Sequence, residues 1–197
     1  RHRLASGEVR EVEVRSSPVT IGSQQLLHSI IHDVTEQVRA EAALRHQLDF
    51  EKLLARVSRL FLDFPLEEID TSINYTLQLI GKFVDVDRSY LYLVSNDLTT
   101  VEIGYEWCAP GVKPELKKTL AMAVESFTWA TEQLLTQEVL HVPRVADLPP
   151  EAHVERAEFV AQGVQSALIV PLLFHPIMGF FGFETVRREK TWSEESI

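Results

Sequence analysis

Residues 163–187 read GVQSALIVPLLFHPIMGFFGFETVR. Within this stretch, Ser166–Phe174 and Gly179–Arg187 are two strongly apolar runs of strand length, and His175–Met178 bridges them. Because both runs are nearly continuous in hydrophobicity rather than alternating, we expect the sheet that holds them to be covered on both faces. A long helix on one side and shorter helices on the other are the elements that would supply this cover.

Those elements are predicted upstream of the two strands. The apolar spacing of Leu66–Phe83, which follows Pro65, predicts a helix that stops near Gly81. Another helix is predicted to end at Gly163, because glycine readily adopts the left-handed conformation that often follows a helix. The remaining predicted elements are strands at Arg88–Ser95, Val101–Cys108 and Val139–Val142, helical pieces within Leu116–Leu135 broken near Val124–Thr128, and the helix Glu151–Gln162.

The long helix is predicted for Asp33–Phe64, which reads DVTEQVRAEAALRHQLDFEKLLARVSRLFLDF and contains neither Gly nor Pro. Its strong helix formers favour one continuous helix of about 48 Å. Apolar residues repeat along it every seven positions, clearly from Phe50 onward and weakly before it. We therefore expect a bend or a change of pairing near Arg45 and His46. The repeat comprises Ala43, Phe50, Val57 and Phe64, interleaved with His46, Leu53 and Leu60.

Two interpretations of this repeat stay open. In the first, the apolar face of an ordinary helix packs on its own sheet through Leu53, Leu54, Val57, Leu60 and Phe61. In the second, which the length of the helix favours, two copies of the chain form a parallel homodimer along Ala43–Phe64. The interface of that dimer would consist of Phe50, Leu53, Val57 and Leu60.

The first 32 residues alternate between apolar and polar types, which predicts strands at Glu8–Arg15 and Gln24–His32. Strands of this number and size cannot bury a core alone. With the motif Asp33-Val34-Thr35-Glu36 that follows them, they resemble the C-terminal half of a PAS domain. Asp33 or Thr35 is then expected to cap the long helix. Most of the ligand pocket of a PAS domain lies in its front half, so no PAS cofactor is inferred here.

Residues from about 46 to 197 resemble a GAF domain. Four pieces carry this resemblance through their order and spacing: Gly163–Ser166, Val170–Leu172, Gly179–Phe183 and Trp192–Glu195. The resemblance implies an α+β fold, with a GAF-like antiparallel sheet, helices on both of its faces, a long connector helix before it and the last strands of a PAS-like sheet. The expected parts are 1–34 (end of a PAS domain), 35–49 (connector helix) and 50–197 (GAF domain).

Composition excludes several classes of partner. Lys and Arg total 19 and Asp and Glu total 29, which gives a net charge of −10, and no basic cluster is longer than Arg187-Arg188. This argues against a nucleic-acid groove and against a membrane-surface patch. No apolar run approaches the roughly 20 residues of a membrane span. We expect a soluble, cytoplasmic segment without direct membrane contact.

Catalytic and cofactor motifs give no positive signal. In phytochrome-like GAF domains a cysteine, usually beside a histidine, carries a bilin, but Cys108 lies in Trp-Cys-Ala-Pro and is expected to be a half-buried strand residue. The Asn-Lys…Phe…Asp-Glu pattern of cyclic-nucleotide-binding GAF domains is missing. His32 closes a strand rather than lying on a phosphoacceptor helix, and the other histidines lack the spacing of metal ligands. We predict no enzyme activity, no cofactor and no metal.

The resemblance therefore implies a non-catalytic sensory and signal-relay fragment of a multidomain bacterial signalling protein. Its output domain, further along the same chain, would be a histidine kinase of a two-component system or a cyclic-di-GMP cyclase or phosphodiesterase. Its small-molecule pocket, between the sheet and the middle helices, is expected at Tyr92, Tyr105, Trp107, Phe127 and Trp129, although core packing would explain these residues equally. The alternatives are a ligand-free dimerisation spacer and a chromophore-binding photosensor.

Overall fold

The computed structural model describes residues 1–63, 68–95, 99–116, 127–136, 139–174 and 177–192. The chain forms two compact units, Arg1–Ala55 and Arg56–Ile197. The boundary between them falls inside helix α1 (Thr35–Asp63), which continues through Arg45 and His46 without interruption.

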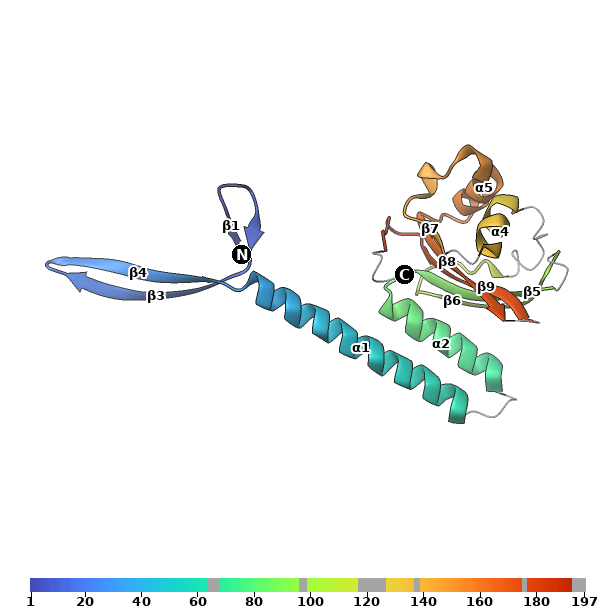
Figure 1. The fold of residues 1–197 in the computed structure, drawn as a ribbon, viewed down its shortest axis with the longest axis horizontal. Helices are drawn as coiled ribbons and strands as arrows, with labels where there is room; N and C mark the ends of the chain where they lie inside the picture. The colour runs from blue at the N-terminus through green and yellow to red at the C-terminus, as the bar shows by residue number, and fades with distance from the viewer. Residues whose placement is uncertain (64–67, 96–98, 117–126, 137–138, 175–176, 193–197) are drawn as a thin grey trace. The chain divides into compact units, whose positions relative to one another are not determined.

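The first unit contains two antiparallel hairpins, as expected from the alternating pattern (Figure 1). One pairs β1 (His2–Arg3) with β2 (Val9–Arg10), and the other pairs β3 (Val12–Ile21) with β4 (Gln24–Asp33). The strand predicted at Glu8–Arg15 is therefore split at Glu11. Many apolar side chains of the longer hairpin are exposed within this unit: Val14, Val19, Ile21, Leu26, Leu27, Ile30 and Ile31.

Glu11 leaves the strand because its backbone joins the start of α1. Its N–H donates to the Thr35 hydroxyl over 2.9 Å, and its carbonyl accepts the N–H of Val34 over 2.9 Å. The Asp33 carboxylate accepts the N–H of Thr35 over 2.9 Å, so the expected cap on the long helix is confirmed. The hydroxyl and N–H of Thr35 hold the pKa of Asp33 below its usual value. The hairpin thus passes directly into the helix.

The second unit is built on a five-stranded antiparallel sheet with the order β6-β5-β9-β8-β7. The two apolar strands predicted from residues 163–187 are confirmed and pair with each other. The remaining strands also lie close to where the sequence predicts them. Their bounds are β5 (Arg88–Val94), β6 (Val101–Cys108), β7 (Leu140–Val142), β8 (Ser166–Phe174) and β9 (Ile177–Thr185).

Helices cover both faces of this sheet, as predicted (Figure 1). On one face, α2 (Ile69–Phe83) packs against β5 and β6, where the sequence predicts the long helix instead. The helix ends at Phe83, as predicted, and Gly81 lies within its last turn. A Cβ at Gly81 would meet the Trp107 ring at 2.6 Å, so the glycine lets α2 approach the sheet closely.

The opposite face carries two short helices, α4 (Thr128–Leu135) and α5 (His153–Ala161), with 3-10 turns at η3 (Val145–Asp147) and η4 (Pro150–Ala152). The first turn of the predicted helix Glu151–Gln162 is thus η4. Most of the predicted break at Val124–Thr128 lies outside the described residues. Between these helices and the sheet lies an apolar core formed by Leu140, Val142, Val145, Leu148, Ala152, Val164, Ala167 and Ile169.

The end of α5 confirms the predicted role of Gly163. Gly163 has a φ of 74°, its N–H donates to Val160 O over 3.1 Å, and the N–H of Val164 donates to Phe159 O over 2.8 Å. This pair of bonds is the Schellman arrangement, which depends on a left-handed residue and therefore favours glycine. It fixes the position of Gln162, the last residue before the turn.

Candidate functional site

A cavity of about 130 Å³ lies between the sheet and the two short helices. It is enclosed by side chains from β5, β6, β8 and β9 on one side and from α4 and α5 on the other. The lining combines aromatic and charged side chains. The lining residues include Arg88, Tyr90, Tyr92, Glu106, Phe127, Ala130, Glu155, Glu158, Phe159, Gln162, Phe180 and Glu184.

The alternation of side chains along β5 builds the floor of the cavity. Arg88, Tyr90 and Tyr92 occupy alternate positions and line the cavity. The two tyrosine rings are stacked, with their centroids 4.7 Å apart, and the Phe180 ring is edge-on to Tyr92, with the two centroids 5.5 Å apart. The tyrosines have this space because Gly182, on the neighbouring strand, has no Cβ, which would otherwise meet the Tyr90 ring at 1.9 Å.

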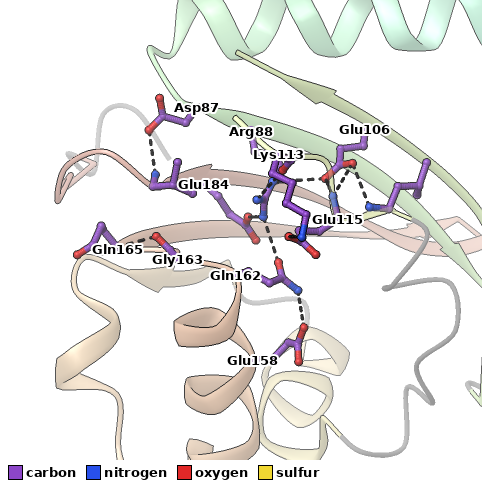
Figure 2. A network of polar contacts seen from close by, with 12 residues as sticks. Asp87, Arg88, Glu106, Lys113, Glu115, Glu158, Gln162, Gly163, Gln165 and Glu184 are labelled. Carbon is purple, nitrogen blue, oxygen red and sulfur yellow. Dashed lines mark hydrogen bonds and ion pairs between the residues drawn. The ribbon is translucent and has the colours of Figure 1, made fainter. Parts of the chain in front are cut away.

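Arg88 is the buried centre of the polar network in Figure 2. Its side chain is 2% exposed, and its Nη1 donates to Glu184 Oε2 over 2.7 Å. Its Nε lies 3.4 Å from Glu106 Oε1 in a second ion pair. Its Nη2 donates to the carbonyl of Lys113 over 3.2 Å. Two carboxylates and a carbonyl therefore surround a single guanidinium.

Gln162 connects this network to the helical side of the cavity. Arg88 Nη1 donates to Gln162 Oε1 over 3.0 Å, and Gln162 Nε2 donates to Glu158 Oε1 over 2.7 Å (Figure 2). The amide oxygen of Gln162 thus accepts a hydrogen bond from the sheet, and its amide nitrogen donates one to α5. A displacement of α5 would therefore change the hydrogen bond between Gln162 and Arg88.

Glu106 connects Arg88 to the loop that follows β6. Its two carboxylate oxygens accept the backbone N–H groups of Glu115 and Leu116 at 3.0–3.1 Å. The loop after β6 is thereby held against the sheet (Figure 2). The ion pair with Arg88 completes the environment of this carboxylate.

Glu155 links the two short helices. It is 4% exposed, and its Oε1 accepts the N–H of Ala130 over 3.0 Å. Ala130 lies in the first turn of α4, where N–H groups have no partner within the helix, and the N-cap residue Phe127 supplies none from its side chain. Glu155 therefore caps α4 from a different helix.

Burial and neighbouring charges shift the pKa values of Arg88 and Glu184 in opposite directions. Burial raises the pKa of Glu184 above its usual value, although Arg88 and the Tyr90 hydroxyl act in the opposite direction. Burial also opposes the charge on Arg88, but Glu184 and Glu106 outweigh it, so the pKa of Arg88 is raised. Burial and the charge of Glu184 raise the pKa of Tyr90 as well.

Cys108, at the end of β6, is a free, half-buried thiol, as expected. It follows Glu106 on the same face of the strand, and burial together with the Glu106 charge raises its pKa to about 11. The thiol is therefore a weak nucleophile near neutral pH.

The structure brings two of the five predicted pocket residues, Tyr92 and Phe127, to the cavity. The others lie elsewhere. Tyr105 donates from its hydroxyl to Asp70 of α2 over 2.6 Å, and Trp107 contacts Gly81, also in α2. Trp129 packs against the apolar core beside β7.

The predicted interface residues all lie on α1. The Phe50 side chain is 45% exposed, and Leu53, Val57 and Leu60 are half-buried. Two further apolar residues of the helix, Leu54 and Phe61, are also exposed. An interface between two copies at these positions stays a prediction.

Sequence reasoning missed the charged half of the site. Arg88 begins an apolar strand, and Glu184 interrupts the apolar run of β9, so each carries a charge where the surrounding sequence is that of a buried strand. Such charges are rarely buried without a partner. That signal was available, whereas the burial of Glu106 and Glu155 had no signal of this kind.

Among the described residues, no group of three or more His, Cys, Asp or Glu side chains has the arrangement of a metal site. The described helices include none with the length and hydropathy needed to cross a bilayer.

Two curated signalling proteins resemble the chain. The methanogenesis regulatory histidine kinase FilI of Methanothrix harundinacea is 31% identical over 140 residues, which cover 66% of this chain and 15% of that protein. The diguanylate cyclase DgcM of Escherichia coli is 34% identical over 58 residues, which cover 29% of this chain and 14% of that protein. The chain thus spans about one seventh of the length of these relatives. No family model matches it.

Solved GAF domains resemble its fold. A phycocyanobilin-bound GAF domain of a cyanobacterial phytochrome has a TM-score of 0.57 and 20% identity, over 74% of this chain and 84% of that one. The GAF domain of a phosphoenolpyruvate-protein phosphotransferase from Coxiella burnetii also has a TM-score of 0.57, with 13% identity, over 76% of this chain and 84% of that one. The expected fold class is confirmed: the sheet and its helices form a GAF-like fold.

Proposed function

We propose that this chain is a non-catalytic sensory and relay segment of a multidomain signalling protein, and that its GAF-like unit binds a small molecule in the cavity. The observation that carries the proposal is the combination of a GAF-like fold with a cavity whose lining connects the sheet to α4 and α5. The similarity to a histidine kinase and a diguanylate cyclase supports a signalling role.

The connections around the cavity support a relay as well as binding. The chain from Glu184 through Arg88 and Gln162 to Glu158 runs from β9 to α5 without a break. Glu155, on the same helix α5, accepts the N–H of Ala130 and so joins α5 to α4 by a separate hydrogen bond. A ligand that moves either helix would change the hydrogen bonds of Arg88, which provides a discrete structural response.

Two further parts of the proposal concern the first unit. The exposed apolar residues of the β3–β4 hairpin support its assignment to the end of a larger, PAS-like sheet. Pairing of two copies along α1, through Phe50, Leu53, Val57 and Leu60, would carry the signal as a change in helix register or tilt. The output domain would be a histidine kinase or a cyclic-di-GMP enzyme, located further along the same protein.

One observation favours a second candidate, a GAF-like dimerisation spacer that binds nothing. Nη1 and Nη2 of Arg88 already donate to Glu184, Gln162 and the carbonyl of Lys113 at 2.7–3.2 Å, and Nε lies 3.4 Å from Glu106 Oε1 in an ion pair without a hydrogen bond. A guanidinium paired with two carboxylates in this way also serves a purely structural role, because a buried charge needs such partners whether or not a ligand binds.

A cavity-filling variant separates the two candidates. Ala130 lines the cavity, and its contribution to the α4 cap is made by its backbone, so Ala130→Leu fills space without removing that hydrogen bond. In a thermal-shift screen of metabolites, a sensor predicts a compound that stabilises the natural chain and not the variant. Native mass spectrometry of the purified chain would identify any ligand that co-purifies. A spacer predicts equal responses of both proteins and no bound mass.

A further inference from the structure

We propose that the cavity selects a small organic cation, with a protonated amine bonded to Glu155 and an apolar body of about one ring on the tyrosine floor. The inference rests on the proposed function, because it names the ligand class of the same cavity. It comes from three independent features of the lining.

The first feature is the balance of charge. Among the described lining residues, Arg88 is the one cation, whereas Glu106, Glu155, Glu158 and Glu184 are acidic. The Arg88 guanidinium is already paired with Glu184 and Glu106 and also donates to Lys113 O and Gln162. An anionic ligand would have to compete with these two carboxylates for Arg88, and the acidic groups of the lining would repel it. The cavity therefore disfavours carboxylates and phosphates.

The second feature is the incomplete bonding of Glu155. This carboxylate is 4% exposed, and within the described part of the chain its hydrogen-bond partner is the N–H of Ala130, at Oε1. A buried carboxylate normally has several donors or a counter-charge, because its desolvation is otherwise costly. Glu106, by comparison, has two backbone N–H groups and Arg88. A ligand ammonium group at Oε2 would supply what Glu155 lacks.

The third feature is the size and surface of the cavity. Its volume of about 130 Å³ is close to the roughly 150 Å³ of an engineered cavity that binds benzene. Tyr90, Tyr92 and Phe180 present stacked and edge-on rings along its wall. Aromatic faces attract cations as well as apolar groups. A single ring that carries an amine fits all three features.

The test compares three probes of nearly equal shape: benzylamine, which is cationic at pH 7, benzyl alcohol, which is neutral, and benzoate. Isothermal titration calorimetry of the 197-residue chain is expected to give measurable binding of benzylamine, about tenfold weaker binding of benzyl alcohol and no binding of benzoate.

Glu155→Gln isolates the charge of the proposed anchor. Glutamine keeps an oxygen that accepts the Ala130 N–H, so the cap on α4 is retained. The variant should bind benzylamine about tenfold more weakly and benzyl alcohol with little change. Glu151→Gln is the matched control, because Glu151 is exposed, lies in η4 next to α5 and does not line the cavity. It should leave the affinity of both probes unchanged.

Tighter binding of benzoate than of benzylamine would overturn the inference, and so would undiminished benzylamine binding by Glu155→Gln. If benzoate binding were also lost in Ala130→Leu, the cavity would remain a sensor site of another ligand class. Failure of all three probes would overturn the ligand class, and the metabolite screen with Ala130→Leu would then decide separately on the proposed function.

Discussion

Arg88 Nη1 lies 2.7 Å from Glu184 Oε2, although the two residues are 96 positions apart and their side chains are 2% and 4% exposed. They are directly opposite in the register of β5 and β9. The ion pair therefore joins two interior strands of the sheet, near the start of β5, and both residues line the cavity. Its integrity is expected to control both stability and the response to a ligand.

Arg88→Met is predicted to destabilise the chain by about 3–5 kcal/mol, because it leaves the buried carboxylates without their counter-charge. Urea unfolding followed by circular dichroism measures this loss. Arg39→Met is the control, because it removes an exposed ion pair on α1, in which Arg39 lies 3.2 Å from Glu36. It should lower the free energy of unfolding by less than about 0.5 kcal/mol.

The loss in Arg88→Met should also depend on pH. Burial raises the pKa of Glu184 in the folded chain, and Arg88 partly offsets that rise. A carboxyl whose pKa is higher in the folded chain contributes most stability at a pH below its pKa in the unfolded chain, which is about 4.3. That contribution is lost as the pH rises through the pKa of the folded chain. Removing Arg88 raises the pKa of Glu184 in the folded chain further. The variant should therefore lose more stability between pH 5 and pH 8 than the natural chain does. Parallel pH profiles would contradict this account.

Cys108 is predicted to react slowly with iodoacetamide. With a pKa of about 11, roughly one thiol in a thousand is ionised at pH 8, compared with about a quarter for an unperturbed thiol. The alkylation rate should rise about tenfold per pH unit from pH 7 to pH 10 and become ordinary when the chain is unfolded in urea. A plateau near pH 9 in the folded chain would show that burial and Glu106 do not raise this pKa.

Two glycines of β9 are predicted to differ in what their replacement disturbs. In Gly179→Ala the new Cβ would lie 2.3 Å from the carbonyl oxygen of Tyr92, a backbone atom, so the strands must separate, at a cost of about 1–3 kcal/mol. In Gly182→Ala it would meet the Tyr90 ring, which lines the cavity. Both variants should lower the melting temperature, but Gly182→Ala should also change the affinity for cavity ligands measured well below it. Equal affinities would contradict the role given to Tyr90.

The predicted dimer is tested by a double substitution on α1. Leu53→Glu with Val57→Glu places charges on the seven-residue repeat and should convert the dimer to a monomer in sedimentation velocity. Leu62→Glu is the control, because Leu62 is 83% exposed and lies off the repeat, so the dimer should persist. A dimer that survives the double substitution would eliminate this interface.

The sequence was sufficient to predict the sheet, its helices and the cap at Asp33, because each depends on local patterns. Apolar runs marked β8 and β9, and Gly163 marked the end of α5. The close contact of Gly81 with Trp107 has no local signal, because tertiary packing alone brings Trp107 to this position of α2.

The site was less predictable, because it also depends on tertiary packing and not on local patterns. Alternation along β6 separates Tyr105 and Trp107 from Glu106, but both faces of the sheet are covered by helices, so alternation alone does not indicate which face holds the cavity. The partners of Arg88 depend on the strand order β6-β5-β9, which places Glu106 and Glu184 on either side of it. That order is a property of the whole fold.

Ligand binding in the cavity is tested most directly by the thermal-shift screen of a metabolite library against the natural chain and Ala130→Leu. A ligand site predicts at least one compound whose stabilisation of the natural chain rises with concentration, saturates and is absent in the variant. If no compound distinguishes the two proteins, or if every stabilising compound acts equally on both, the cavity is not a ligand site.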